Sequence, residues 1–431
     1  MTRRLVVCLD GTWNSSFSEH MRKDPRGDHK VLRPTNTLKT CRAVKPFAGD
    51  AAKTMQICYY DVGVGALAEY PGTANKLLHT VDRLLGGAFA AGFEGNVEDA
   101  LHFLTVNFDE GDEVYIFGFS RGAAEARAVT SFLDWNGGLP PKNDAYFLPI
   151  LFRAYVDGKS QTSRDQAVAK INDDLKNHGH PPLETSRFRH IPVRYLGVWE
   201  TVLAIGSRLR DTGAENDAER HAFFTGNAPA TCVAHARQAL GVDEHRWDFR
   251  PEVWKSCRRE QTMEQRWFVG VHSNIGGGYG RDGLANIALR WILSGAKDED
   301  LDLDWDFLEH FEGHSNGALY NSSTAGYQVL DGLRRRDGHR VIPADAELDQ
   351  SIFDRMTKRV DELDKTDDNA IFEIYRPRNV IEFLAKKSEA ELHEYLTNIG
   401  VTQLPDDVKE QVTRLRDNQL LPRSTSALSP S

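Results

Sequence analysis

The residues whose types and spacing point most directly to chemistry lie at Gly118–Gly122, which reads GFSRG. An apolar run, EVYIFGF, leads into this pentapeptide, and a helical pattern follows it at once. A G-x-S-x-G sequence between a strand and a helix predicts a sharp, strained turn, at which Gly118 and Gly122 must be small so that strand and helix can approach each other. The turn presents the Oγ of Ser120 at the end of the strand. We therefore interpret Ser120 as a candidate nucleophile.

A serine nucleophile needs a base to accept its proton and an acid to orient that base. In a strand–turn–helix site of this type the chain order is serine, acid, histidine. The run VRYLGVW is followed by Glu200 and the run RWFVGV by His272, so a carboxylate and an imidazole come in that order. We expect His272 to be the base and Glu200 to be the orienting acid. Asp243, in LGVDEHR, is the alternative acid.

An acyl-transfer intermediate also needs backbone N–H donors for its oxyanion. One donor is expected from Arg121, which follows the nucleophile, and the other from a loop after an early strand. The segment LVVCLDGTWN provides such a loop, in which Gly11 or Thr12 could supply the second N–H. Asp10 either shapes this loop by accepting hydrogen bonds or is a turn residue without a part in catalysis.

The elements that must position these residues alternate along the chain. Near-continuous apolar runs predict strands that are covered on both faces, and helical patterns lie between them. This alternation predicts an α/β fold with a mostly parallel sheet, whose strand carboxyl ends form one edge where ligands gather. The predicted strands are Arg4–Leu9, Met55–Tyr60, Glu113–Phe119, Val193–Trp199 and Arg266–Val271, and the predicted helices are Thr37–Val44, Asn75–Phe108, Gly122–Leu133 and Arg164–Lys176.

The chain divides by composition into a catalytic domain over residues 1–297 and a mainly helical C-terminal extension over residues 298–420. The acidic run DEDLDLDWD marks this boundary. Residues 207–230 are polar and turn-rich, and we expect them to form a surface insertion that acts as a flap near the site. Residues 421–431 are rich in serine and proline and are expected to be a disordered tail.

The composition excludes several classes of protein. The 431 residues are 40% hydrophobic and 27% charged, as in a globular protein. The formal charge of −10 argues against a nucleic-acid partner. No apolar run approaches the ~18 residues of a transmembrane helix. The five cysteines are widely spread without a C-x-x-C pair, and the N-terminus does not resemble a signal peptide. A cytoplasmic location is expected, with export by a signal-independent secretion system as the alternative.

The remaining motifs give no reason to expect a cofactor or a metal. Residues Gly278–Gly283 match G-x-G-x-x-G, but His272 separates them from the preceding strand, whereas a dinucleotide site needs the glycines directly after it. His310 and His314 do not form an H-E-x-x-H motif. His178 and His180 lie beside two prolines, and we interpret them as loop residues.

Nine segments of the chain, in order from about Arg4 to Val380, resemble the successive blocks of a known family. They are LVVCLDGTWN, PTNTLK, YYDVGVG, GFSRGAAEAR, YLGVWETV, ALGVDEHRWDFRPEVW, WFVGVHSNIGGGY, GLANIALRWIL and IYRPRNV. The family consists of α/β hydrolases and includes the phospholipase effectors of type VI secretion. The resemblance implies an α/β-hydrolase fold and a serine esterase or phospholipase, with Ser120 as nucleophile and His272 as base. In this family the acid block usually reads V-W-D-T-V, whereas this chain has Glu200 in place of the aspartate.

The expected function is a serine-dependent carboxylic ester hydrolase that forms an acyl-enzyme. The resemblance makes a phospholipid the expected ester, reached by transient contact with a membrane. Two alternatives stay open: an esterase for short-chain or polysaccharide-borne esters, and a catalytically silent hydrolase-fold module that binds a partner. The departure at Glu200 motivates the second alternative. The oligomeric state does not follow from the sequence.

Overall fold

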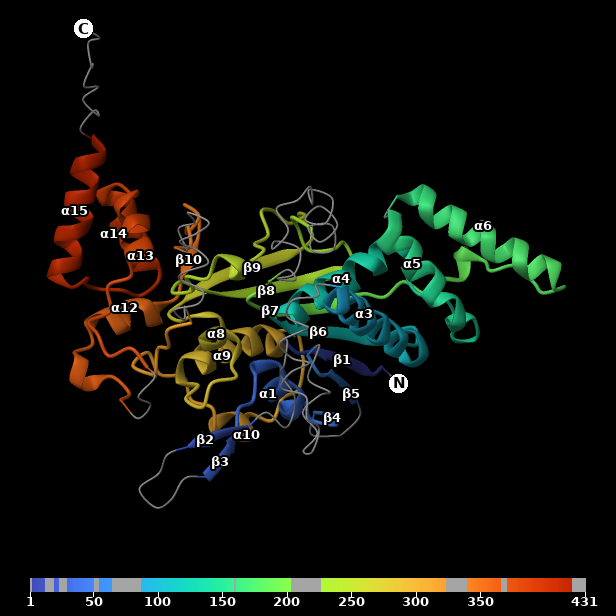
Figure 1. Ribbon diagram of the computed structural model, residues 1–431, viewed down its shortest axis with the longest axis horizontal. Helices are drawn as coiled ribbons and strands as arrows, with labels where there is room; N and C mark the ends of the chain where they lie inside the picture. The colour runs from blue at the N-terminus through green and yellow to red at the C-terminus, as the bar shows by residue number, and fades with distance from the viewer. Residues whose placement is uncertain are drawn as a thin grey trace, which may run out of the picture.

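The computed structural model describes residues 2–11, 19–22, 29–49, 54–63, 87–158, 160–202, 226–322, 339–365 and 370–420. Its centre is an eight-stranded sheet in the order β10-β9-β8-β7-β6-β1-β5-β4 (Figure 1). Every neighbouring pair is parallel except β4 and β5. The strands are β1 (Arg4–Leu9), β4 (Phe47–Ala48), β5 (Thr54–Asp61), β6 (Glu113–Phe119), β7 (Val193–Trp199), β8 (Val233–Gly241), β9 (Thr262–Phe268) and β10 (Glu347–Leu348). The expected α/β class with a mostly parallel sheet is confirmed.

Helices cover both faces of this sheet. One face packs against α3 (Gly87–Asn107), α4 (Arg121–Asn136) and α5 (Leu148–Gly158), and the other packs against α1 (Asn36–Ala43), α9 (Gly283–Asp298) and α10 (Trp305–Glu309). The helix α6 (Gln161–Asn177) projects with α5 at the right of Figure 1. A separate antiparallel pair, β2 (Glu19–Arg22) and β3 (His29–Leu32), completes the N-terminal part.

The two-sided covering explains why the strands read as continuous apolar runs. In β1, Leu5 and Val7 belong to the core on the α3–α4 side, whereas Val6 and Cys8 belong to the core on the α1–α9 side. All four side chains are fully buried. Successive side chains of a strand point to opposite faces, so a strand between two helical layers needs apolar residues at every position.

The residues after Asp298 are joined to the sheet as well as to one another. The strand β10 adds to the edge of the sheet beside β9. A third core contains residues of β8, β9 and the C-terminal helices, among them Leu240, Trp267 and Phe353. These helices are α12 (Gln350–Thr357), α13 (Arg378–Ala385), α14 (Glu389–Asn398) and α15 (Asp406–Leu420), at the left of Figure 1.

Several expectations about organisation stay predictions. The domain boundary at residue 298 is one of them. The insertion at residues 207–230 falls outside the described residues up to position 225, and the tail at residues 421–431 does so entirely. Across the described ranges, no helix combines the length and the apolar character that crossing a bilayer requires.

The turn between β6 and α4 has no room for a side chain at either glycine of the G-x-S-x-G motif. A Cβ atom at Gly122 would lie 2.1 Å from the carbonyl oxygen of Leu9, and one at Gly118 would lie 2.3 Å from the carbonyl oxygen of Gly122. Both obstacles are backbone atoms, so no side chain can rotate away. The glycines of the G-x-S-x-G motif are therefore fixed by the contact between β1, β6 and α4.

We expect Gly122→Ala to destabilise the protein by about 3 kcal/mol or more, because the backbone of β1 or α4 must move to admit the methyl group. Urea denaturation measures this loss. Gly95→Ala is the matched control, since Gly95 lies in α3 with open space around its Cβ position. This control should gain about 0.5–1 kcal/mol. Equal stabilities of the two variants would contradict the packing argument.

Candidate active site

The backbone at Ser120 is held in a strained conformation between β6 and α4. Its φ is 60° and its ψ is −117°, a region that non-glycine residues rarely adopt. Two hydrogen bonds tie this turn to the end of the neighbouring strand β7. The N–H of Ser120 donates to the carbonyl of Trp199 at 3.0 Å, and the N–H of Val202 donates to the carbonyl of Ser120 at 3.2 Å. The serine therefore has a fixed position at the carboxyl edge of the sheet.

Glu200 follows β7 directly and also has a positive φ, of 51°. Its N–H donates to the carbonyl of Ala239 in β8 at 2.9 Å. The N–H of Gly241, at the end of β8, donates to Glu200 Oε1 at 2.6 Å. The left-handed turn thus brings the carboxylate back over the strand ends. The side chain is fully buried.

His272 is the first residue of the short helix α8 (His272–Gly276) and bridges the other two residues. Its Nε2 lies 2.8 Å from Ser120 Oγ, and its Nδ1 lies 3.0 Å from Glu200 Oε2. A carboxylate can only accept hydrogen bonds, so Nδ1 carries the proton and Nε2 is left to accept the proton of Ser120. The structure thus brings together the three residues that the sequence selected from the ends of separate strands.

Burial shapes the charges of this group. It lowers the pKa of His272, although the adjacent Glu200 carboxylate acts in the opposite direction. Burial alone would raise the pKa of Glu200, but the charge and hydrogen bonds of Arg340, together with His272, outweigh it and hold that pKa below its usual value. Both shifts favour a neutral imidazole beside an ionised carboxylate. A neutral imidazole is the form that can accept a proton.

Arg340 is a member of the site that the sequence did not suggest. Its two terminal nitrogens lie 2.7 Å from Glu200 Oε1 and 2.7 Å from Glu200 Oε2. The signal was absent from the sequence because Arg340 stands outside every motif, 140 residues after its partner. A buried Glu next to a histidine implies a compensating cation somewhere in the chain, but nothing local says which one it is.

The alternative acid, Asp243, has different partners. It accepts hydrogen bonds from the N–H of Gly270 at 2.7 Å and from the hydroxyl of Tyr375 at 2.8 Å. Burial raises the pKa of Asp243 to about 6, against these hydrogen bonds. Its described hydrogen bonds hold the loop before His272, and none of them reaches the imidazole. Glu200 alone of these two carboxylates contacts His272.

The loop after β1 is organised by Asp10. Its carboxylate accepts hydrogen bonds from the N–H of Gly11 at 2.7 Å, from the hydroxyl of Thr35 at 2.6 Å and from the hydroxyl of Tyr60 at 2.7 Å. Burial raises the pKa of Asp10 to about 6. The loop lies against the start of α4, since Leu9 and Asp10 present their carbonyl groups to Gly122.

The expected oxyanion donors are placed in part. Arg121 is the first residue of α4, directly after Ser120. The N–H of Gly11 is bonded to the Asp10 carboxylate in this structure. Thr12 lies outside the described residues. The two loops therefore adjoin each other, and the assignment of the second N–H stays a prediction.

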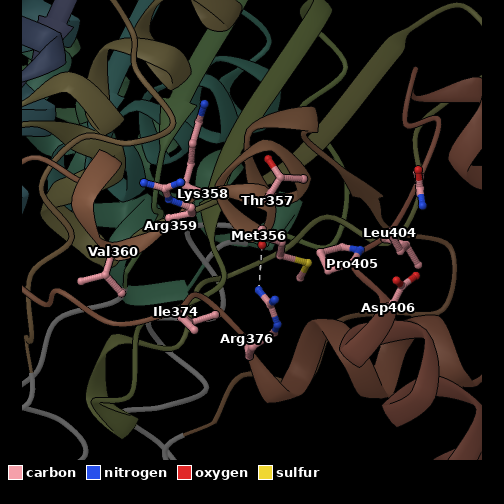
Figure 2. A pocket seen from close by; sticks show the side chains of 11 residues that line it. Met356, Thr357, Lys358, Arg359, Val360, Ile374, Arg376, Leu404, Pro405 and Asp406 are labelled. Atoms are coloured by element: carbon pink, nitrogen blue, oxygen red, sulfur yellow. Dashed lines mark hydrogen bonds between the residues drawn. The ribbon is translucent and has the colours of Figure 1, made fainter.

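A cavity of about 450 Å³ lies away from this group, among the C-terminal helices (Figure 2). Its lining comes from the end of α12, the segment around Arg376 and the start of α15, and it includes none of the three site residues. Within the described parts of the chain, no cluster of three or more His, Cys, Asp or Glu side chains has the geometry of a metal site.

Comparison with known proteins assigns the family. Residues 3–295, more than half of the chain, match the model of the catalytic domain of the Tle1-like phospholipase effectors of the type VI secretion system. The chain belongs to this family.

One curated protein is similar to the chain at a low level of sequence identity. The uncharacterized protein YEL023C of Saccharomyces cerevisiae is 25% identical over 253 residues, which are 58% of this chain and 32% of the yeast protein. The match thus spans about a third of that relative's length.

Two solved structures also align with the chain, and both alignments have low TM-scores. An uncharacterized protein from Pseudomonas aeruginosa aligns over 97% of this chain and 62% of its own, with 15% identity and a TM-score of 0.38. The Tle1 effector bound to the VgrG spike of the type VI secretion system aligns over 79% of this chain and 81% of its own, with 13% identity and a TM-score of 0.40.

We expect Asp243→Asn to be stabilising at neutral pH, with a gain that depends on pH. The folded-state pKa of Asp243 is about 6 against 3.8 for a free side chain. A raised carboxyl pKa means that wild-type stability falls as the pH rises from about 4 to about 6, where the unfolded chain ionises first. The neutral amide avoids this loss. In urea denaturation, the gain in free energy of unfolding of the variant over the wild type should be larger at pH 8 than at pH 4 by up to about 3 kcal/mol. A loss of stability at pH 8 would mean that the carboxylate itself is required.

Proposed function

We propose that this chain is a serine-dependent carboxylic ester hydrolase with an α/β-hydrolase catalytic domain, and that its substrates are phospholipids. The observation that carries the proposal is the continuous series of contacts from Ser120 Oγ through His272 to Glu200, at 2.8 Å and 3.0 Å. The strained turn at Ser120, between a parallel strand and a helix, supports a nucleophile elbow. Membership in a family of phospholipase effectors supports a lipid ester as the substrate.

The proposed reaction follows the acyl-enzyme route, and the contacts of Ser120, His272 and Glu200 support it. Ser120 Oγ attacks the ester carbonyl carbon while His272 Nε2 accepts the hydroxyl proton. Glu200 stabilises the imidazolium that forms, and the N–H groups of Arg121 and of Gly11 or Thr12 hold the oxyanion. The C–O bond then breaks, and the alcohol leaves with the proton from His272. Water hydrolyses the acyl-enzyme by the same steps, which releases the carboxylic acid and restores Ser120.

The proposal extends to the cellular setting of the protein. Family membership supports delivery by the type VI secretion machinery to a membrane that contains the substrate. The scheme uses no metal ion and no organic cofactor, and the contact with the membrane would be transient. Phospholipid hydrolysis at such a surface is the activity to test.

A fluorophosphonate probe tests the nucleophile without knowledge of the substrate. We expect intact-mass analysis to detect one adduct on the wild-type protein and none on Ser120→Ala. His272→Ala should slow labelling by several powers of ten, because Ser120 then has no base. The absence of an adduct on folded wild-type protein would contradict the proposal and would favour the silent binding module.

Asp243→Asn is the matched control for the acid, because Asp243 lies near the same strand ends without a described hydrogen bond to His272. It should be labelled at nearly the wild-type rate, whereas Glu200→Gln should be labelled much more slowly. The reverse order would transfer the role of the acid to Asp243.

Hydrolysis assays with esters of increasing acyl length test the substrate class. We expect the rate to rise from p-nitrophenyl acetate to long-chain esters, and phospholipid vesicles to release fatty acid. Ser120→Ala should abolish both activities. A maximum at acetate together with inert vesicles would instead favour the short-chain or polysaccharide esterase, although the serine mechanism would stand.

A further inference from the structure

The guanidinium of Arg340 and the carboxylate of Glu200 form a buried, bidentate ion pair. The side chain of Arg340 is 2% exposed and that of Glu200 is not exposed at all. The two nitrogen–oxygen distances are both 2.7 Å, so the planar guanidinium meets both carboxylate oxygens. The pair lies directly behind His272, because Oε2 of the same carboxylate contacts His272 Nδ1.

The contacts saturate the carboxylate. Oε1 accepts from Arg340 and from the N–H of Gly241, and Oε2 accepts from Arg340 and lies beside His272 Nδ1. Each oxygen thus has two partners, and the plane of the carboxylate cannot rotate without breaking several hydrogen bonds. A glutamate has one more rotatable bond than an aspartate, so its carboxylate has more conformations to choose from. Arg340 supplies a constraint that compensates for this freedom.

Arg340 is itself held by the backbone. Its terminal nitrogens also donate to the carbonyl of Gly241 at 2.6 Å and to that of Phe249 at 2.6 Å. The side-chain amide of Asn379, in α13, donates to the carbonyl of Arg340 at 3.2 Å and to that of Val242 at 2.8 Å. Arg340 therefore has a fixed place relative to the strand ends, set by the C-terminal helices.

We propose that Arg340 is a positioning residue of the active site, which fixes the Glu200 carboxylate against His272 and limits the affinity of the His272–Glu200 pair for a further proton. This inference rests on the proposed serine mechanism. It also means that the site is incomplete without the C-terminal part of the chain, because Arg340 lies beyond residues 3–295, which match the catalytic-domain model.

The charge of Arg340 has a definite effect on the pH dependence. The reactive state has a neutral His272 and an ionised Glu200, and one extra proton on this pair inactivates it. A neighbouring cation disfavours that proton, whichever of the two side chains would hold it. Removing the cation should therefore move the acid limb of the rate profile to higher pH. Burial, together with the charge of Arg246, already lowers the pKa of His272 against the opposite effects of Glu200 and Glu244. The wild-type limb should therefore lie below that of a free imidazole.

The experiment measures the rate of fluorophosphonate labelling from pH 5 to pH 9 for the wild type, Arg340→Gln and Arg340→Lys. We expect Arg340→Gln to shift the acid limb upward by about one pH unit, and to lower the plateau rate about 10- to 100-fold because the carboxylate is no longer fixed. Arg340→Lys keeps the charge but loses the fork. Its limb should stay near that of the wild type, while its plateau rate falls.

Arg355→Met is the matched control. Arg355 is another arginine of the C-terminal part and is 1% exposed, but it donates to the carbonyls of Ser315 and Gly317 rather than to the site. It should lower the melting temperature without moving the acid limb. If Arg340 only stabilised the fold, Arg340→Gln would likewise lower the melting temperature and leave the acid limb in place. A shift of the acid limb in Arg340→Gln but not in Arg355→Met therefore separates a positioning role from a purely structural one.

A double-mutant cycle tests whether Arg340 acts through Glu200. Adding Arg340→Gln to Glu200→Gln should change the labelling rate little, because Arg340 acts through a carboxylate that is already gone. The inference is overturned if either Arg340 variant, once shown to be folded, keeps the wild-type plateau rate, or if the losses in the double variant simply add. An unlabelled wild-type protein would instead overturn the serine mechanism, so the two failures are distinguishable.

Discussion

The site depends on two strained backbone turns at adjacent strand ends. Ser120 follows β6 with a φ of 60°, and Glu200 follows the neighbouring strand β7 with a φ of 51°. Strain of this kind costs of order 1–3 kcal/mol for each residue and persists only where the surroundings over-determine the backbone. Here the sheet holds both backbones in their strained conformations, because the two turns are hydrogen-bonded to each other through Trp199 and Val202. Any change that separates β6 from β7 would therefore displace nucleophile and acid together.

The second constraint is electrostatic, and it separates four buried acids near the site by their direct partners. Glu200 is paired with Arg340. Glu244, which accepts a hydrogen bond from the backbone N–H of His272 at 3.2 Å, is paired with Arg246 at 2.8 Å. Both carboxylates have a lowered pKa, and that of Glu244 is about 2. Asp10 and Asp243 have hydroxyl and N–H partners, and burial raises the pKa of each to about 6. At Asp10 and Asp243 the hydrogen bonds from neutral groups do not offset desolvation, whereas at Glu200 and Glu244 a directly bonded guanidinium does. The only carboxylate of the four that contacts the imidazole of His272 is one of the two that an arginine keeps ionised.

Much of this arrangement could be predicted from the sequence, because its signals are local. The G-x-S-x-G motif, the apolar strands and the polar residue after each strand are all contained in short segments. The strand β8 (Val233–Gly241) was missed, since His235, Arg237 and Gln238 interrupt its apolar pattern. Arg237 is accommodated by Glu264 on the neighbouring strand and by the carbonyl of Trp291 on α9. Strand β9 also begins and ends earlier than expected, at Thr262–Phe268, so that His272 opens a helix instead of closing a strand.

Long-range pairs carry no such local signal. Arg340 and Glu200 are 140 positions apart, and Tyr375 and Asp243 are 132 positions apart. In both pairs the acid lies at the strand ends of the sheet and its partner lies in the C-terminal part. The core that joins Leu240 and Trp267 to α12, α13 and α15 places these partners, so apolar packing far from Ser120 sets the polar geometry next to it. The helices after residue 298 thereby contribute to the site without lining it, and their distance from the motifs hides this contribution from any reading of the sequence alone.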